Sequence, residues 1–307
     1  MVNDAGGRLS TSAHTLSGDT RKGRWLWPVW YGLNMWNNRS RRDDAEINKF
    51  HRENLDGNFP VSEKASSPSR RLTDLFLASL PWWKIAAQMG GDIRLADVGC
   101  GNGSYSAFYR QVCQCDGTFE YVGFDQRSYR EWDGLRSDSV SFEVCSASEA
   151  LIRTEKRINV IATISAVEHF TDDLVFFRSL RDYVRDCDYP VIQMHFVPSW
   201  ACLWLYGVHG VRQYTPRTMR QIRELFSADG DSTLYYLGGP HCNRLHFTHI
   251  TLPRKIGLGD LRFKKPDEYE HKLKNAILHD FDQQSGPPSF LALVVCSNTA
   301  GDFSLSL

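Results

Sequence analysis

The chain has 307 residues, of which 42% are hydrophobic, and its 36 basic and 36 acidic side chains give a formal net charge of zero. This length accommodates one enlarged α/β domain or two small domains, with a buried core in either case. The neutral balance disfavours nucleic acid and anionic membrane surfaces as partners, and no apolar run approaches the ~20 residues that a transmembrane segment requires.

The first 68 residues are predicted to lie outside the core. Residues 1–23 are rich in Gly, Ser, Thr, Asp and Arg and lack the apolar stretch of a signal peptide, so they are predicted to form a flexible tail. Residues 24–68 are predicted to form an N-terminal aromatic cap with helical parts. Its aromatic residues include Trp25, Trp27, Trp30, Tyr31 and Trp36. Their faces suit a sugar, a flat ring or a cation, although packing against the core or a second subunit is the favoured interpretation.

Strands and helices alternate from residue 69 to residue 238, which is the predicted core. A helix is predicted from Ser69, because apolar residues recur on one face of it from Leu72 to Leu80. Strands are predicted at residues 93–98, 119–124, 140–145, 159–164, 190–196, 233–237 and 290–296. Further helices are predicted at residues 104–113, from Thr171 onward, and from Thr215 and Pro216 to about residue 226. This βαβ series predicts an α/β fold, Rossmann-like and doubly wound, around a mainly parallel sheet.

A late insertion separates the last two predicted strands. Residues 239–288 exceed the short connection usual in a compact domain, so they are predicted to form an inserted cap with a helix near residues 267–280. Residues 289–307 then hold the last core strand and a tail. Three histidines, His241, His246 and His249, lie in the insertion with only Cys242 near them, so we predict no metal site. The eight cysteines form no CxxC pair, which predicts reduced thiols and a cytoplasmic protein.

A glycine-rich run follows the first predicted core strand. Asp97, Gly99, Gly101 and Gly103 stand where this apolar strand turns into a helix. Glycines at such a turn adopt backbone conformations barred to other residues and let a cofactor lie against the main chain. The spacing is GxGxG, and Ser104 occupies the third glycine position of a GxGxxG dinucleotide fingerprint, which weakens an NAD interpretation. The run does not match a P-loop either.

This run resembles the first motif of the class I S-adenosylmethionine (SAM)-dependent methyltransferase family, an acidic residue followed by xGxGxG. The resemblance, to members that act on small molecules, implies SAM as the cofactor. It implies that Gly99, Gly101 and the neighbouring backbone, with Cys100 and Gly103, contact the methionine part of SAM. Asp97 is expected to help hold the ammonium group of SAM. The alternative for Asp97 is a strand-end residue that caps the next turn.

Two further segments extend the resemblance. Asp125 ends the second strand, where an acidic side chain can accept hydrogen bonds from both ribose hydroxyls. Gln126 and Arg127 follow it and are candidates for flanking the adenosine, although they suit a solvated loop equally well. Ser146 and Ala147 follow the third strand and are candidates for contacting the adenine edge. The favoured alternative is that the serines of this turn cap the next helix.

The run from Ile164 to Phe170 resembles the fourth-strand element of methyltransferases that modify quinones, sugars and amines. Ser165 and Ala166 are predicted to border the cofactor through their backbone, and Glu168 and His169 to face the transferred methyl group or the acceptor. A hydroxyl acceptor must lose its proton, and a histidine with a near-neutral pKa suits that role. His169 is therefore the first candidate base, while Glu168 orients it or binds an acceptor amine.

A second candidate base is His195, which falls at the end of the fifth strand and is predicted to point toward the same cleft; a hydrogen-bonded structural histidine is the alternative. The chain is thus predicted to methylate an oxygen or nitrogen of a small molecule, such as a sugar or another secondary metabolite. The alternatives are a methyltransferase acting on protein or RNA, a non-catalytic SAM-binding module and an oxidoreductase. Neutral charge disfavours RNA, and the intact acids and glycines disfavour a degenerate module. A homo-oligomer is compatible with the sequence.

Overall fold

The computed structural model describes residues 28–29, 31–32, 35–36, 47–52, 60–113, 115–154, 157–170, 172–206, 213–283, 285–299, 303 and 305. The predicted tail, residues 1–23, lies outside this described part, as do Trp25, Trp27 and Trp30 of the aromatic cap. The described residues of that cap include Tyr31, which is half-buried, and Trp36, which is exposed.

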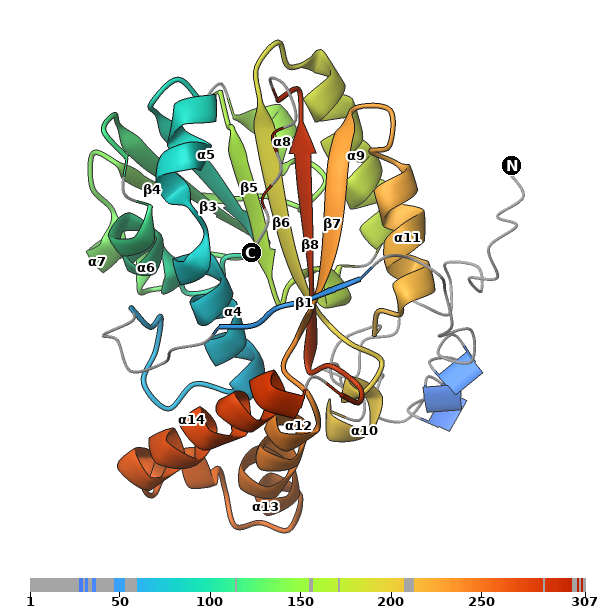
Figure 1. The fold of residues 1–307 in the computed structure, drawn as a ribbon. Coiled ribbons are helices and arrows are strands. Elements are labelled where there is room, and N and C mark those ends of the chain that lie inside the picture. Colours follow the sequence, from blue (N-terminus) through green and yellow to red (C-terminus); the bar gives the residue numbers. More distant parts are fainter. Residues whose placement is uncertain are drawn as a thin grey trace.

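An eight-stranded sheet forms the centre of the molecule (Figure 1), with the strand order β1-β7-β8-β6-β5-β2-β3-β4. The strands are β1 (Asn48–Lys49), β2 (Ile93–Val98), β3 (Phe119–Asp125), β4 (Val140–Val144), β5 (Val160–Ile164), β6 (Val191–Pro198), β7 (Gly230–Leu237) and β8 (Phe290–Ser297). β8 runs antiparallel to both of its neighbours, and the other pairs are parallel. The predicted mainly parallel, Rossmann-like sheet is therefore confirmed. The two-residue strand β1 was not expected.

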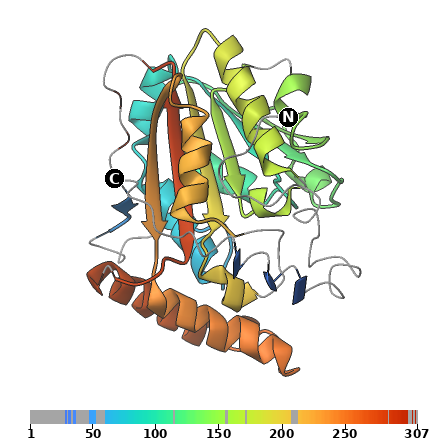
Figure 2. The same ribbon diagram turned by 90° about the vertical axis from the view of Figure 1, so that its right-hand side faces the viewer.

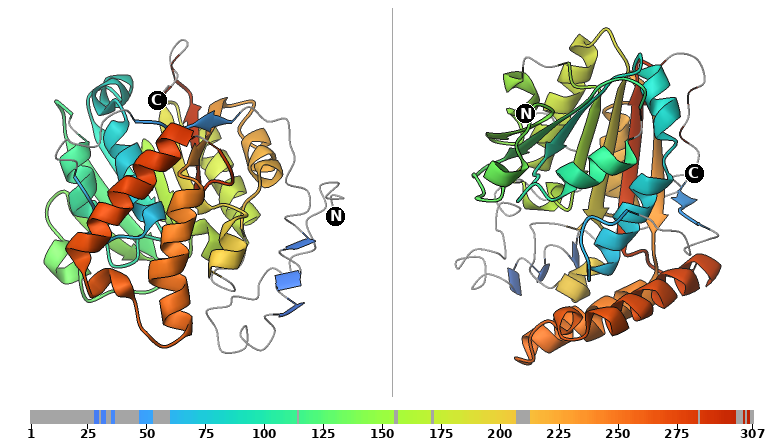
Figure 3. Two further views of the ribbon diagram at one scale, coloured as in Figure 1. Left: turned by 60° about the horizontal axis from the view of Figure 1, so that its bottom comes forward. Right: turned by 90° about the vertical axis from the view of Figure 1, so that its left-hand side faces the viewer.

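Helices cover both faces of the sheet, as Figures 2 and 3 show. They are α4 (Pro68–Ser79), α5 (Trp82–Gln88), α6 (Tyr105–Val112), α7 (Trp132–Leu135), α8 (Ala150–Arg153), α9 (Asp173–Asp186), α10 (Cys202–Tyr206) and α11 (Pro216–Glu224). Phe76 of α4 and Phe108 of α6 belong to one hydrophobic cluster, and Phe177 of α9 and Ile222 of α11 to a second. The sheet separates the two clusters, which is the layered packing of a doubly wound fold.

Capping side chains and prolines set the ends of several helices. The Ser67 hydroxyl accepts the backbone N–H of Arg70 at the start of α4, and Thr215 caps α11 in the same way. α4 ends at Ser79, two residues before Pro81, because a helix rarely continues into the residue that precedes a proline. Thr171, the predicted cap of α9, lies outside the described residues. The carboxylate of Asp172 caps α9 instead, accepting two backbone N–H groups.

The late insertion is helical and lies beneath the sheet (Figure 2). It contains α12 (Pro240–His246), the π-helix η2 (Phe247–Thr251), α13 (Leu252–Lys255), the short η3 (Leu261–Phe263) and α14 (Pro266–Gln283), so the helix expected near residues 267–280 is present and longer. α12 packs on both α14 and α4. A bidentate ion pair, Arg71 to Glu270 at 2.8 and 2.9 Å, joins α4 to α14. None of the helices in the described part of the chain has both the length and the hydropathy to span a bilayer.

Candidate active site

The glycine-rich turn after β2 combines one crowded glycine with one open glycine. Gly99 has a φ of +82°, and a Cβ atom there would lie 2.4 Å from the Cβ of Ala166, which no real contact permits. Gly101 has a φ of +55°, and a Cβ atom there would meet nothing within 4 Å. Gly99 therefore packs the turn tightly against the end of β5, whereas Gly101 exposes bare main chain to open space.

Asp125 lies directly beside this turn, at the end of β3. The backbone N–H of Gly101 donates to Oδ2 of Asp125 at 3.0 Å, and the N–H of Arg127 lies 3.4 Å from Oδ1. The side chain is half-buried, and the neighbouring Gln126 is exposed. The structure thus brings together the two segments, turn and acidic strand end, that the sequence predicts to share one cofactor.

Asp97 lies in the interior at the end of β2, with 2% of its surface exposed. The phenol of Tyr121 donates a hydrogen bond to it at 2.9 Å. Burial, reinforced by the negative charge of Asp125, raises the pKa of Asp97 to about 7, although Tyr121 and the charge of Arg70 oppose the shift. Asp97 therefore changes its charge near neutral pH.

Trp132, which no sequence motif marks as a site residue, supports the glycine turn from outside. Its indole N–H donates to the carbonyl oxygen of Gly101 at 2.8 Å, and its ring stacks on Phe142 with centroids 5.0 Å apart. Phe142 also fills the space beside Gly103, where a Cβ atom would come within 2.5 Å of the ring. An isolated buried tryptophan in a polar segment after β3 is a weak signal, because nothing in the sequence says what it contacts.

The turn after β4 also reaches this region. The N–H of Cys145 donates to the carbonyl oxygen of Asp125 at 2.9 Å, which places the half-buried Ser146 and Ala147 next to the end of β3. The favoured alternative, a serine cap on the next helix, is wrong for α8. That helix has Glu149 at its N-cap position and no side-chain capping bond.

Ser165 and Ala166 connect the glycine turn to a cavity. Ser165 has a φ of +50°, which a residue with a side chain adopts only when its surroundings hold it there, and its N–H donates to the carbonyl oxygen of Phe196 at 3.0 Å. Ala166 fills the space beside Gly99, and Ser165 lines the cavity. This strained bend therefore sits between the predicted cofactor position and the space beyond it.

The cavity has a volume of about 450 Å³ and lies at the carboxyl ends of the parallel strands. Its lining residues are Glu63, Ser67, Ser69, Arg70, Ser165, Glu168, Pro198, Leu205, His246, Ile250, Thr251, Arg254, Lys255, Arg262 and Phe290. We call the strand ends and the residues just after them, Ser165, Glu168, Pro198 and Phe290, the floor of the cavity. The start of α4 forms the wall, with Ser69 and Arg70. The insertion forms the roof, with His246, Ile250, Thr251, Arg254, Lys255 and Arg262. In open α/β sheets this edge is where ligands bind.

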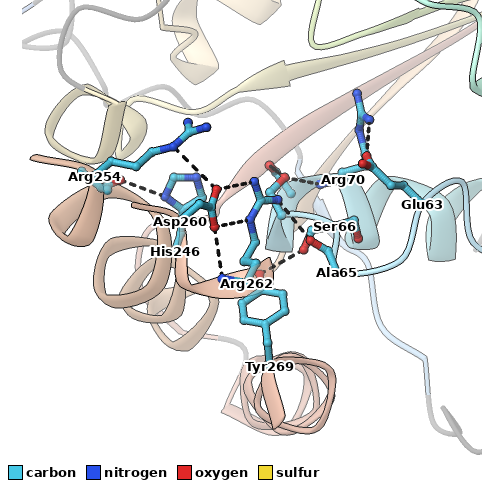
Figure 4. A network of polar contacts seen from close by, with 12 residues as sticks. Glu63, Ala65, Ser66, Arg70, His246, Arg254, Asp260, Arg262 and Tyr269 are labelled. Carbon is cyan, nitrogen blue, oxygen red and sulfur yellow. Dashed lines mark hydrogen bonds and ion pairs between the residues drawn. The ribbon is translucent and has the colours of Figure 1, made fainter. Parts of the chain in front are cut away.

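A network of polar contacts fixes the roof to the wall (Figure 4). Arg262 binds the carboxylate of Asp260 at 2.8 Å and donates to the carbonyl oxygen of Ala65 at 3.2 Å. The phenol of Tyr269 donates to the carbonyl oxygen of Ser66 at 3.0 Å. Two segments nearly 200 residues apart in the sequence therefore hold the cavity closed on this side.

The three catalytic candidates lie in different surroundings. Glu168, in the short helix η1 (Val167–His169), is buried and lines the cavity. His169 is half-buried, and it is absent from the described residues that line the cavity. The expectation that His195 points into the cleft is wrong. Its ring is fully buried in the core, within 3.0 Å of the Thr163 hydroxyl, and burial lowers its pKa to about 3.

His195 points away from the cleft because its side chain alternates with those of its neighbours on β6. Met194 and Phe196 belong to the cluster on one face of the sheet, so His195 projects to the other, where it meets the rings of Phe176 and Phe177. The insertion's histidines have ordinary partners as well. His241 contacts Asp280, which caps α12, and among the described residues no group of three metal-ligating side chains is assembled.

Comparison with known proteins identifies the fold. No family model matches the chain, and no curated protein is similar to it in sequence. The plantazolicin methyltransferase BamL, solved with a triazolic desmethylPZN analog and SAH, is 12% identical with a TM-score of 0.51; the match covers 94% of this chain and 97% of that one. A SAM-dependent methyltransferase from Archaeoglobus fulgidus (14% identity, TM-score 0.45, 76% and 95% covered) and the [4+2]-cyclase SpnF (13%, 0.46, 91% and 96%) are also similar. The chain therefore has the Rossmann-like fold of the plantazolicin methyltransferase.

Proposed function

We propose that this chain is a SAM-dependent methyltransferase that transfers a methyl group to an oxygen or nitrogen of a small molecule. One observation carries the proposal: the bare main chain at Gly101 is tied to the carboxylate of Asp125 at the sheet edge where a capped cavity opens. A shared fold does not by itself define an activity, whereas the residues of this site can bind a specific cofactor.

The residues at the turn fit SAM. The open space at Gly101 admits a ligand against the backbone, and Asp125 keeps lone pairs on both oxygens for two ribose hydroxyls. Asp97 supplies the negative charge expected near the ammonium group once it is ionised. Ser146 and Ala147 lie next to Asp125, where the adenine edge is expected. Ser165 and Ala166 lie beside Gly99, on the side of the turn where the methionine part of SAM is expected. Bound SAM would supply a methyl group on a positively charged sulfur.

The chain's own residues would then position the acceptor and exclude water. Methyl transfer is a direct displacement, so alignment of the acceptor atom beside Ser165 accounts for most of the expected catalysis. Glu168 is the favoured base for a hydroxyl acceptor, or the group that holds an amine, because this residue belongs to the lining of the cavity. The volume of about 450 Å³ suits a small molecule such as a sugar or another secondary metabolite.

Further parts of the proposal rest on the sequence. We propose a cytoplasmic enzyme, supported by eight cysteines without a disulfide, that acts on acceptors other than nucleic acid. Residues 24–68 and 239–288 are proposed to serve as caps on the acceptor side, with residues 69–238 and 289–307 as the core. A homo-oligomer is compatible with this organisation.

Calorimetric titration with SAM, S-adenosylhomocysteine and NAD tests the cofactor class. We expect micromolar binding of the two sulfur compounds and none of NAD. Binding of NAD alone would favour an oxidoreductase, and a chain that binds none of the three would contradict the proposal.

Binding of SAM is expected to strengthen as the pH rises from 6 to about 7.5. Below its pKa of about 7, Asp97 carries a proton and cannot attract an ammonium group, whereas above it the carboxylate is charged. The α-amino group of a ligand has a pKa of about 7.7–8.0, so more than half of it stays protonated across this range. Calorimetry across this range should show a several-fold gain for the wild-type chain and a flat, weaker profile for Asp97→Asn. A wild-type profile that is equally flat would remove Asp97 from this role.

Replacing Trp132 with phenylalanine should weaken S-adenosylhomocysteine binding by about five-fold. The variant keeps the stacking on Phe142 but loses the hydrogen bond to the carbonyl oxygen of Gly101, a contribution of about 1 kcal/mol. Trp83→Phe, at an exposed tryptophan of α5, is the matched control. Equal affinities of the two variants would show that the indole N–H does not support the turn.

A further inference from the structure

The cavity has an acidic floor and a basic roof. On the floor, Glu168 lies at the end of the sheet, close to the bend at Ser165. On the roof, three cationic side chains of the insertion line the space: Arg254, Lys255 and Arg262. The acidic side chain of the floor and the cationic side chains of the roof therefore come from different elements of the fold.

The roof cations outnumber the carboxylate beside them. Asp260 is almost fully engaged by Arg262, through contacts of 2.8 and 3.0 Å. Arg254 contacts the same carboxylate through Nε at 3.6 Å, and 62% of its side chain is exposed, so its guanidinium remains accessible to a ligand. Lys255 is exposed and adds a further positive charge. One carboxylate thus faces three cations in the described part of the roof.

The wall does not cancel this excess. Arg70 lines the cavity too, but it pairs with Glu63 at 3.0 Å, and both members of that pair belong to the lining. Their charges balance each other. The net positive charge is therefore localised at Arg254 and Lys255, on α13 of the insertion, whereas Glu168 belongs to η1, just after β5.

We infer that the acceptor is a small molecule with an anionic oxygen group, a carboxylate or a phosphate, that binds Arg254 and Lys255 while its hydroxyl or amino group faces Glu168. This inference rests on the proposed function. A guanidinium stays charged at all relevant pH values and presents paired donors that match the oxygens of such anions. Binding at the roof would turn the opposite end of the acceptor toward the sheet edge, where the methyl group is expected.

Direct titration with small probes tests this inference without knowledge of the natural acceptor. Benzoate and phenyl phosphate are the anionic probes, and benzamide and phenol are their neutral counterparts. Each is titrated calorimetrically into the full chain, with and without saturating S-adenosylhomocysteine. We expect the two anions to bind at least about ten-fold more tightly than their counterparts, as charge-assisted hydrogen bonds predict.

The double variant Arg254→Gln and Lys255→Gln should lose this preference while keeping its affinity for S-adenosylhomocysteine, which also reports that it folds. A matched control replaces two cations remote from the cavity, Lys84→Gln and Arg157→Gln, and should keep the preference. A Lys255→Glu variant provides the same test if the double variant is unstable.

Equal affinity for anionic and neutral probes, no binding of any probe, or an unchanged preference in the double variant would each overturn the inference. Failure to bind S-adenosylhomocysteine would instead contradict the proposed function. Titration of the probes in the absence of S-adenosylhomocysteine tests the anion site separately from the proposed cofactor site.

Discussion

Replacing Asp125 with alanine is expected to weaken S-adenosylhomocysteine binding by about 10- to 100-fold. The change removes the proposed acceptor for both ribose hydroxyls, and hydrogen bonds to a charged group contribute about 1.5–3 kcal/mol. It also releases the N–H of Gly101, which Asp125 holds at 3.0 Å, so the turn itself loses its anchor. Calorimetry measures the affinity, and thermal unfolding shows whether the variant folds.

Two controls separate the ribose contacts from a general loss of structure. Asp133→Ala removes an exposed carboxylate of the nearby helix α7 and should leave the affinity unchanged. The analogue of S-adenosylhomocysteine without its 2′ and 3′ hydroxyls should bind wild type weakly, and Asp125→Ala should weaken its binding less than that of the parent compound. If removing the hydroxyls and replacing Asp125 weaken binding by fully additive free energies, Asp125 does not contact the ribose.

Glu168→Gln is expected to lower kcat by about 100-fold or more for a hydroxyl acceptor, with little change in SAM affinity. General base catalysis typically contributes about 10²- to 10⁴-fold, and an amide of the same shape cannot take up the proton. Glu168 is favoured over His169 because Glu168 belongs to the described lining of the cavity and His169 does not. Release of S-adenosylhomocysteine is measured with the best acceptor found in a panel of hydroxy and amino carboxylic acids and their amides.

His169→Ala and Glu224→Gln are the comparisons for this experiment. Glu224 is an exposed carboxylate on α11, so its variant should turn over as wild type does. His169→Ala should retain most of its turnover if Glu168 is the base. The reverse pattern, with activity lost in His169→Ala and kept in Glu168→Gln, would assign the proton transfer to His169.

Local patterns were sufficient to predict the core of the fold. The run from Ile93 to Val98 is a strand with the predicted bounds, because a buried parallel strand appears in the sequence as a short apolar block ended by glycine. Thr215 and Pro216 start α11 as expected, since the proline loses no hydrogen bond at that position. The antiparallel placement of β8 between β6 and β7 depends on long-range pairing that no local pattern encodes.

The acceptor side of the site could not be predicted in the same way. Arg254, Lys255 and Arg262 line a cavity only because the insertion folds back over the sheet end, and their sequence neighbours give no sign of it. His195 shows the opposite error. Because His195 lies near a strand end, the sequence predicts that its side chain points into the cleft. Side chains alternate along β6, however, so the ring of His195 points into the core and contacts Thr163.

A crystal structure of the chain with S-adenosylhomocysteine tests the central claim most directly. We expect the ribose hydroxyls to lie within hydrogen-bonding distance of Asp125, the homocysteine part to lie along the main chain at Gly101, and the sulfur to point toward Ser165 and the cavity. A ligand bound at another edge of the sheet, or one whose ribose leaves the Asp125 carboxylate uncontacted, would contradict it.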